Sequence, residues 1–385
     1  MYAAFGNGYL QEDQMNILLA PDSFKGTFTS REISCALEAA ILRHHPSAHV
    51  KKVLISDGGE GFLAAVLSLL PGQVMTNTVT GPYGEPVKAQ WAILPDGTGV
   101  IEMAQASGLG LNTQRNPLVA TSFGTGELIA HALDAGCHRI LLGLGGSATN
   151  DGGVDMIKAL GAQISYVDHN EHFGGAGLSL IDRIDLGTMD PRISETQFDV
   201  LCDVQNHLLG PQGATYTFGP QKGADHEMLG ELEAGMNHLS QLMGEILGVS
   251  LDSLPGGGAA GGMGAMLLGA FHATFHLGID LLLHMSHFEQ LVSWADVVIT
   301  GEGKIDGQSA QGKVLSGIGK YCTNTRLLAL CGVLGPDYSQ IYQHHVDAVM
   351  PIVCDFMDFS TMEKHKQAYL EDAADRLVRL ALFSY

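Results

Sequence analysis

Short apolar runs in this chain repeatedly end in polar loops that are rich in glycine. The clearest example is GLGGSATNDGG, residues 143–153, which follows the apolar run RILL. Fifty of the 385 residues are glycine, well above the usual share of roughly 7%. No collagen-like or low-complexity period accounts for them. We therefore expect many tight loops at strand ends, where the backbone approaches a ligand or another loop closely.

Both ends of the chain have the pattern of a parallel α/β domain. NILLA (16–20) and VKKVLI (50–55) indicate buried strands, and apolar residues recur at helical spacing between them, with Ser30 as the expected N-cap. ADVVITGEG, RLLALCGVLG and HVDAVMPIV repeat the strand pattern near the C-terminus. We predict one doubly wound parallel sheet, Rossmann- or flavodoxin-like, built from residues 15–72 and 290–385.

The middle of the chain predicts a second domain of a different kind. VMTNTVTGP, PVKAQWAIL and GTGVIEMA alternate in polarity and are rich in β-branched residues, which indicates a hairpin or meander. RILLGLG and FDVLCDV are further strand candidates with helical segments around them. We predict an inserted mixed α/β domain over residues 73–289, with a small-molecule site in the cleft between the two domains. Residues 1–14 precede the first strand pattern and are expected to be a disordered N-terminal extension.

The charge balance excludes several classes of partner. Twenty basic and 41 acidic residues give a formal net charge of −21 and a pI near 5, so nonspecific binding to nucleic acid or to an anionic membrane is not expected. The six cysteines are scattered without a CxxC pair, which fits a reducing cytoplasm. We find no apolar run of membrane-spanning length and no signal peptide. An anionic substrate would therefore need backbone amides and a few placed Lys or Arg side chains.

The loop 143–153 supports more than one interpretation. Gly143, Gly145 and Ala148 satisfy a dinucleotide fingerprint, and Asp168 follows at about the distance of a ribose contact, so a nicotinamide-dependent dehydrogenase stays open. However, TNDGG (149–153) places helix breakers and capping residues before VDMIKALG, so the helix should begin later than in a dinucleotide turn. Amides and hydroxyls at a helix start suit a phosphate or carboxylate. A glycine turn that serves packing alone is the remaining alternative.

Two loops near the N-terminus offer charged side chains at predicted strand ends. APDSFKGT (20–27) presents Lys25 beside a glycine, at the sheet edge where open α/β folds bind ligands. SDGGEG (56–61) brackets its glycines with Asp57 and Glu60, an arrangement that can present carboxylates to Mg²⁺ or to a substrate hydroxyl. Each motif taken alone is also consistent with an ordinary turn.

A late loop, TGEGKIDGQSAQGKV (300–314), nearly completes a Walker A motif. Gly307-x-x-x-x-Gly312-Lys313 matches, but Val314 stands where the metal-binding Ser or Thr belongs. We also expect no strand immediately before Gly307, and therefore reject a P-loop. The polar residues of this segment remain candidates for lining a cleft.

Three more loops complete the set. CDVQN (202–206) and FGPQKGA (218–224) bring polar and basic residues just past an apolar run. LPGGGAAGGMG (254–264) contains a second G-x-G-x-x-G, but no strand is predicted before it, so a backbone cradle fits better than a dinucleotide turn. Six glycine-punctuated polar loops, four of them at predicted strand ends, are difficult to assign to packing alone.

Together these motifs resemble one family, the bacterial type I glycerate kinases. The resemblance runs in order from Met15 to the C-terminus. The motifs that carry it are APDSFKG (20–26), DGGEG (57–61), VIEMAQASGL (100–109), GLGGSATNDGG (143–153), DPR (190–192), CDV (202–204), FGPQKGA (218–224), GGGAAGGMG (256–264) and ITGEGKIDGQS (299–309) followed by GK (312–313). The sequence departs from the family pattern at three places. Ser56 stands where the family usually has Ala, and His207 stands where Pro commonly follows CDVxN. LSG (315–317) replaces a Pro-containing stretch after GK.

The resemblance implies an enzyme that transfers the γ-phosphoryl group of ATP to D-glycerate with Mg²⁺ in the cytoplasm. It favours 2-phosphoglycerate as the product. Phosphoryl transfer depends mainly on positioning and charge stabilisation, which amide-rich loops, a metal and Lys side chains supply. Two alternatives stay open: a nicotinamide-dependent dehydrogenase of a small hydroxy acid, and a noncatalytic phosphate or nucleotide sensor. The sequence leaves homo-oligomerisation open.

We assign expected roles on this basis. Lys25 and Lys222 are expected to neutralise charge on the transferring group, and Asp57 or Asp203 to orient the acceptor hydroxyl or hold Mg²⁺. The loop 143–153 is expected to bind either the glycerate carboxylate or an ATP phosphate. The other candidate substrate- and phosphate-binding residues are Ser23, Gly58, Gly59, Glu60, Gly145, Gly146, Ser147, Thr149, Asn150, Asp151, Asn206, Gly257, Gly258, Glu302, Asp306 and Lys313.

Overall fold

A computed structural model describes residues 15–24, 26–56, 58–276, 278–307, 309–310, 314–353 and 359–382. The chain divides into two compact units. The first unit contains Met1–Ile55 and Ser286–Tyr385, and the second unit contains Ser56–Met285. The expected disordered extension, residues 1–14, lies outside the described residues. None of the described helices is long and apolar enough to cross a bilayer.

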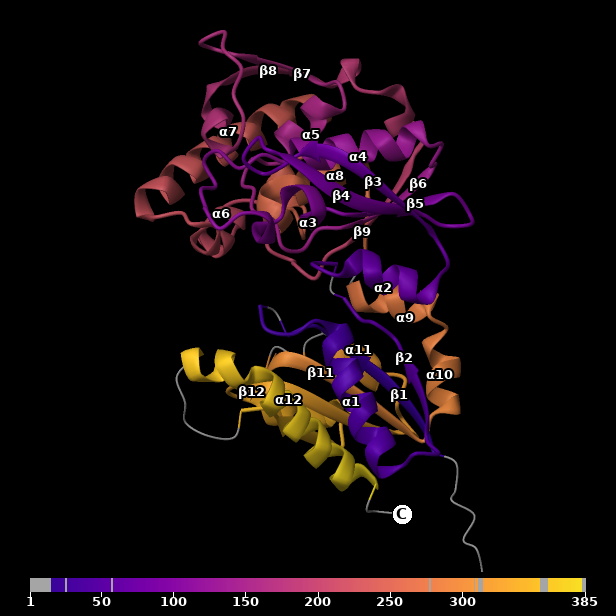
Figure 1. Ribbon diagram of the computed structural model, residues 1–385. Coiled ribbons are helices and arrows are strands. Elements are labelled where there is room, and N and C mark those ends of the chain that lie inside the picture. The colour runs from indigo at the N-terminus through magenta and orange to yellow at the C-terminus, as the bar shows by residue number, and fades with distance from the viewer. Residues whose placement is uncertain are drawn as a thin grey trace, which may run out of the picture. The chain divides into compact units, whose positions relative to one another are not determined.

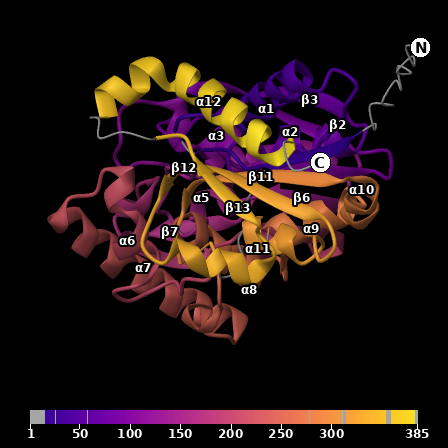
Figure 2. The ribbon, with the colours of Figure 1, turned by 90° about the horizontal axis from the view of Figure 1, so that it is seen from below.

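The first unit is built on a parallel sheet of five strands in the order β13-β12-β11-β1-β2. Figure 2 shows helices α1 and α12 over one face of this sheet and α11 over the other, which is the predicted doubly wound arrangement. The strands are β1 (Asn16–Pro21), β2 (His49–Lys52), β11 (Val297–Ile305), β12 (Arg326–Leu334) and β13 (Ala348–Pro351). The helices are α1 (Ser30–His44), α10 (Phe288–Trp294), α11 (Val314–Gly319) and α12 (Phe359–Leu382).

Helix α1 begins one residue away from the predicted cap. Its N-cap is Thr29, and Ser30 is the first helical residue. The Thr29 hydroxyl accepts a hydrogen bond from the Glu32 amide at 3.2 Å, and the Glu32 carboxylate accepts one from the Thr29 amide at 2.7 Å. This reciprocal capping box satisfies two amides that lack partners within the helix. The helix packs against α12 through the buried core of the first unit.

The second unit contains a mixed sheet of six strands in the order β10-β9-β6-β5-β4-β3 (Figure 1). The predicted meander is confirmed, because β3, β4 and β5 pair antiparallel, whereas β5, β6, β9 and β10 run parallel. Strands β7 and β8 form a separate antiparallel pair. The strands are β3 (Gln73–Thr80), β4 (Pro86–Ile93), β5 (Thr98–Glu102), β6 (Arg139–Gly143), β7 (Gln163–Tyr166), β8 (Ile181–Asp185), β9 (Gln197–Leu201) and β10 (Thr274–His276).

The helices of the second unit enclose a core that includes the buried side chains of Trp91 and Phe198. Helix α4 packs against α5, and both follow loops that carry polar motifs. The helices are α2 (Phe62–Leu69), α3 (Ala104–Ser107), α4 (Phe123–Asp134), α5 (Val154–Ala159), α6 (Ala214–Phe218), α7 (His226–Leu247), α8 (Met263–Ala270) and α9 (Gly278–Met285). The late start of α5 at Val154 is the start expected for a loop that is not a dinucleotide turn.

The unit boundary differs from the one expected after residue 72. Residues 56–72 group with the second unit. Glu102, at the end of β5, accepts hydrogen bonds from the amides of Gly61 at 3.1 Å and Leu63 at 3.0 Å, at the start of α2. Helix α2 also packs against β5. Contacts distant in sequence therefore attach this segment to the inserted domain.

The expectation of no strand before Gly307 is wrong. Strand β11 continues to Ile305, pairing with β12 through its glycines and charged residues. The sequence predicted this strand over ADVVITGEG (295–303) but not its last two residues, Lys304 and Ile305. These two residues are held by pairing with β12 alone, because the pairing with β1 ends at Gly301. The argument against a P-loop therefore depends on Val314 alone.

Candidate functional site

The register of the second sheet brings three strand ends to the same level. Glu102 pairs with Gly143 between β5 and β6, and Gly143 pairs with Leu201 between β6 and β9. The loops that follow β6 and β9 therefore leave the sheet side by side at its carboxyl edge, where open parallel sheets bind ligands. The candidate motifs GLGGSATNDGG and CDVQN occupy these two loops.

Backbone contacts join these loops to SDGGEG. The Gly145 amide donates to the Gly58 carbonyl at 2.9 Å, and the Leu144 amide donates to the Leu201 carbonyl at 3.2 Å. A Cβ atom on Gly145 would lie 2.4 Å from Gly59 Cα, and one on Gly58 would lie 2.5 Å from the Leu201 carbonyl oxygen. Because no side chain fits at either position, glycine is required here for close approach of the backbones.

Lys222 places an ammonium group against the loop 143–153. Its side chain is buried, and Nζ donates to the Ser147 hydroxyl at 2.9 Å and to the Thr149 carbonyl at 2.6 Å. Burial lowers the pKa of Lys222 to about 7, against the opposing effect of the negative charge on Asp151. Two acceptors from one loop thus hold a cation beside a glycine turn.

Two amides at the tip of the same loop are candidates for binding a ligand, one on exposed Gly146 and one on buried Ser147. Gly146 is exposed with φ +78°, whereas most of the loop around it is buried. The loop is tied down by bonds from the Ala148 amide to the Ser107 carbonyl and from the Gly152 amide to the Gly261 carbonyl. In the described part of the chain, no acceptor is found for the amides of Gly146 and Ser147. These two amides lie next in sequence to the acceptors that hold Lys222.

Asp151 is a candidate binding residue whose observed contacts are internal. It is buried, and its carboxylate accepts from the Ser122 amide at 2.8 Å, the Ser122 hydroxyl at 2.6 Å and the Gly153 amide at 3.2 Å. Burial raises the pKa of Asp151, and these hydrogen bonds oppose the increase. These contacts therefore stabilise the conformation of the loop 143–153 from its buried side.

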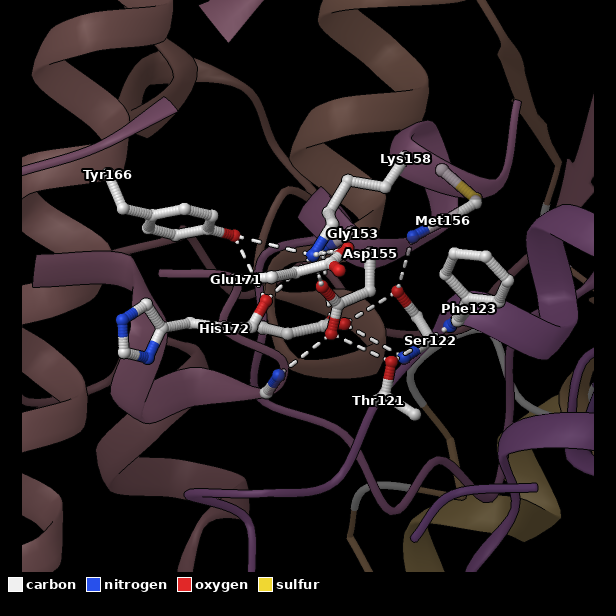
Figure 3. A network of polar contacts seen from close by, with 12 residues as sticks. Thr121, Ser122, Phe123, Gly153, Asp155, Met156, Lys158, Tyr166, Glu171 and His172 are labelled. Carbon is white, nitrogen blue, oxygen red and sulfur yellow. Dashed lines mark hydrogen bonds and ion pairs between the residues drawn. The ribbon is translucent and has the colours of Figure 1, made fainter. Parts of the chain in front are cut away.

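The sequence did not single out Asp155, which lies in the first turn of α5 (Figure 3). Its carboxylate accepts from the Thr121 hydroxyl and the Gly174 amide, both at 2.7 Å. Burial, followed by the charge of Asp151, raises the pKa of Asp155 to about 7. An acidic residue in a first helical turn is usual on electrostatic grounds alone, so its type and position carried no signal.

Asn206 contacts the second glycine loop, LPGGGAAGGMG (254–264). The Gly258 amide donates to the Asn206 carbonyl at 2.9 Å, and Asn206 Nδ2 donates to the Gln212 carbonyl at 2.7 Å. A surface hollow of about 550 Å³ adjoins this contact. It is lined by Gln205, Asn206, His207, Leu209, Pro211 and Gln212. Asn206 is the one residue of this lining that the sequence singled out for binding.

Asn150 is fully buried in the loop 143–153. Its Nδ2 donates to the Thr215 hydroxyl at 3.3 Å, while its Oδ1 lacks a hydrogen-bond partner among the described residues.

Two more candidates lie in the second unit: Glu60 is exposed, and the Gly257 amide donates to the Leu254 carbonyl at 3.0 Å. Ser23, Glu302 and Asp306 lie in the first unit. The Ser23 amide donates to the Asp22 carboxylate at 2.7 Å. Glu302 accepts from the Ser309 hydroxyl at 2.8 Å and from the Leu315 amide at 3.2 Å, at the start of α11. Asp306 forms an ion pair with Lys304 at 2.9 Å. Lys25, Asp57 and Lys313 lie outside the described residues.

One described carboxylate, that of Asp203, lies where a magnesium ligand was expected. Asp203 follows β9 at the carboxyl edge of the sheet, and the close approach of Gly58 to Leu201 brings the SDGGEG loop to the same edge. Carboxylate oxygens are the ligands that Mg²⁺ prefers in proteins. Within the described ranges, no three His, Cys, Asp or Glu side chains cluster as a metal site. Asp57, the expected partner of Asp203, lies outside those ranges.

Comparison with known proteins decides the family. The pattern of the glycerate kinase family matches residues 17–382. The chain belongs to the glycerate kinase family. It is 42% identical over 366 residues to the glycerate kinase of Bacillus subtilis (strain 168), covering 94% of this chain and 96% of that protein. It is 41% identical over 345 residues to the glycerate 2-kinase of Escherichia coli (strain K12), covering 88% and 91%.

The fold agrees with a solved structure. The crystal structure of a protein assigned as glycerate kinase 2 from Salmonella typhimurium LT2 superposes with a TM-score of 0.78 at 38% identity, covering 96% of this chain and 98% of that chain. The predicted α/β class and the family resemblance are thus confirmed. These relatives indicate a kinase.

Proposed function

We propose that this glycerate kinase transfers the γ-phosphoryl group of ATP to D-glycerate in the presence of Mg²⁺ and forms 2-phosphoglycerate. The observation that carries this proposal is the buried Lys222 ammonium held against the loop 143–153, beside the amides of Gly146 and Ser147. The regiochemistry is supported by the 41% identity to a protein named glycerate 2-kinase.

The chain contributes mainly positive charge and positioning to this reaction. Lys222, fixed by Ser147 and Thr149, stabilises the negative charge that develops on the transferring phosphoryl oxygens. The amides at the loop tip bind an anionic oxygen of the glycerate carboxylate or of an ATP phosphate. A dry environment strengthens both interactions, because a low dielectric reduces screening.

We assign the acidic residues of the neighbouring loops to the metal and the acceptor. Asp57 and Asp203 would hold Mg²⁺, which neutralises phosphate charge when it is bound. One of the two carboxylates would instead orient the acceptor hydroxyl of glycerate. Lys25 and Lys313 are proposed as further phosphate-binding cations, and Glu302 and Asp306 as polar residues that assist binding. We also propose a cytoplasmic location, because the six cysteines are scattered along the sequence without a CxxC pair.

An assay of ATP consumption across glycerate, glycolate, lactate and tartronate tests the substrate. We expect turnover that requires Mg²⁺ and a strong preference for D-glycerate. The ³¹P spectrum of the product tests the regiochemistry, because phosphate on C2 couples to one proton and gives a doublet, whereas phosphate on C3 gives a triplet. A triplet, or preferred turnover of another acid, would contradict the proposal.

A further inference from the structure

Ser122 occupies the N-cap position of helix α4, yet its side chain does not cap that helix. The Thr125 amide donates to the Ser122 carbonyl at 3.0 Å, so the backbone of α4 begins in the usual way. Within the described part of the chain, the Ser122 hydroxyl makes no capping hydrogen bond to α4. Serine is favoured at an N-cap because its side chain can accept from an amide of the first turn. The capping capacity of Ser122 is therefore used elsewhere.

The Ser122 hydroxyl caps helix α5 instead. The N-cap of α5 is Gly153, with φ +75°, which has no side chain to offer. Met156 is the third residue of α5, and its amide donates to the Ser122 hydroxyl at 3.0 Å (Figure 3). An N-cap side chain normally makes this contact with the second or third amide of its helix. A serine that lies 34 residues before Met156 thus supplies the cap that glycine lacks.

The hydrogen of the same hydroxyl is donated to Asp151, near the end of the loop 143–153. The hydroxyl donates to Asp151 Oδ2 at 2.6 Å, and the Ser122 amide donates to the same oxygen at 2.8 Å. Asp151 Oδ1 accepts from the Gly153 amide at 3.2 Å. The side chains of Ser122 and Asp151 are both fully buried. Ser122 therefore joins the end of this loop and the start of α5 to the start of α4.

A second contact from the first turn of α4 anchors the same loop further upstream. The Thr125 hydroxyl lies 2.8 Å from the Ser107 hydroxyl, and both side chains are buried. The Ser107 carbonyl accepts a hydrogen bond from the Ala148 amide at 2.9 Å. The loop is thus anchored at Ala148 and at Asp151, and Thr149 lies between these anchors.

The segment between the anchors carries a carbonyl that holds Lys222. Lys222 Nζ donates to the Thr149 carbonyl at 2.6 Å and to the Ser147 hydroxyl at 2.9 Å. A lysine ammonium sits on a flexible stem, so its position is fixed by the acceptors that it contacts. A displacement of about 1 Å in a reacting group can reduce a rate by roughly 10²-fold. The orientation of the Thr149 carbonyl is therefore important for the reaction.

We propose that Ser122 is a positioning residue of this enzyme, which holds the Thr149 carbonyl in the orientation that fixes the Lys222 ammonium. Ser122 acts through Asp151 and through the cap of α5, and Thr125 supports the same carbonyl from the side of Ala148. The effect on the reaction is indirect. The inference rests on the function proposed for Lys222 and places the support of that residue at the start of α4.

The kinetics of S122A test this inference. The substitution removes the acceptor of the Met156 amide and leaves Asp151 with backbone donors alone. We expect kcat to fall about 10- to 100-fold. The KM values for glycerate and ATP should change by no more than about threefold, because Lys222 acts mainly on charge that develops in the transition state. I129V, which truncates a buried side chain of the same helix, is the control and should retain full kcat.

A double-variant cycle separates positioning from general destabilisation. If Ser122 acts through Lys222, adding S122A to K222M should lower kcat no further, because the positioned group is already absent. A merely structural defect would lower the kcat of K222M by the same factor as that of the unmodified enzyme. S122T retains the hydroxyl and should recover most of the lost kcat. Melting temperatures measured in parallel show which variants are folded at the assay temperature.

The outcomes distinguish this inference from the proposed function. Full kcat in S122A, a change confined to KM, no recovery in a folded S122T, or a further loss in the double variant would each overturn the role of Ser122. If S122A does not fold, T125V decides, and full kcat in T125V overturns the inference. Should K222M retain full kcat, the function assigned to Lys222 would fail, and this inference with it. A low kcat in K222M combined with full kcat in S122A would reject Ser122 alone.

Discussion

Replacing Lys222 by Met should make stability less dependent on pH, because the native protein buries a titrating ammonium group. The interval between the ordinary Lys pKa of 10.5 and the folded value of about 7 corresponds to a change of on the order of 5 kcal/mol in the free energy of unfolding, at about 1.4 kcal/mol per pH unit. Met has a similar shape and no charge. K222M loses the hydrogen bonds to Ser147 and Thr149, and the resulting decrease in stability does not vary with pH.

The sign follows from proton counts. Between pH 7 and 10.5 the unfolded chain binds a proton at Lys222 that the folded chain has released. The free energy of unfolding of the native protein therefore rises with pH in this window, at a slope of up to about 1.4 kcal/mol per pH unit. In K222M this contribution is absent. The stability of K222M relative to the native protein should be greatest below pH 7 and fall steadily above it.

Urea unfolding between pH 7 and 9.5 measures this difference. In a W294F background, fluorescence of Trp91, buried in the core of the second unit, reports on the unit that contains Lys222. We expect the difference in unfolding free energy to change by about 3 kcal/mol across this range. K88M, at an exposed Lys on β4, is the control and should show no such trend. A pH-independent difference for K222M would refute the assignment of a buried, titrating Lys222.

Three further changes test the site and its support. K222M should lower kcat by about 10²- to 10³-fold, as loss of a preorganised charge-stabilising group does, and a coupled ATP assay against K88M measures this. G145A should lower both the melting temperature and kcat, because its Cβ would lie 2.4 Å from Gly59 Cα; G110A, where no atom lies within 4 Å, should be nearly neutral by the same measurements. T29A should reduce the unfolding free energy of the first unit by about 1 kcal/mol through loss of the capping box; in a W91F background, urea unfolding followed by Trp294 measures this, and an unchanged midpoint would contradict the cap assignment.

Local patterns were sufficient for most of the secondary structure. Apolar runs such as NILLA and alternating runs such as PVKAQWAIL became β1 and β4 because burial on both faces and on one face produces these two patterns. These patterns did not predict the last two residues of β11, because backbone pairing with β12 extends the strand beyond its apolar run. The N-cap was displaced by one residue because Thr29 and Ser30 are both good capping residues, and only the Glu32 contact selects between them.

The candidate site was predictable in part. Glycine loops at strand ends marked the regions that meet, and Lys222 was found from its place just past an apolar run, in FGPQKGA. Two buried acidic residues were not found in this way. Asp155 lies in an ordinary sequence context, and Glu102 lies in the motif VIEMAQASGL but was not singled out as a site residue. Their hydrogen-bond partners at Gly61, Leu63, Thr121 and Gly174 are distant in sequence.

The amino-acid sequence by itself determined the succession of strands and helices along the chain, the α/β class and the family, since periodicity and motif order are local properties of the chain. The tertiary structure decided which loops touch. The order of the strands within the sheet and their register bring the ends of β5, β6 and β9 to one level. A local sequence pattern does not encode which strands become neighbours in a sheet. Burial then raised the pKa of Asp155 and lowered that of Lys222, because desolvation depends on every element packed around a charge.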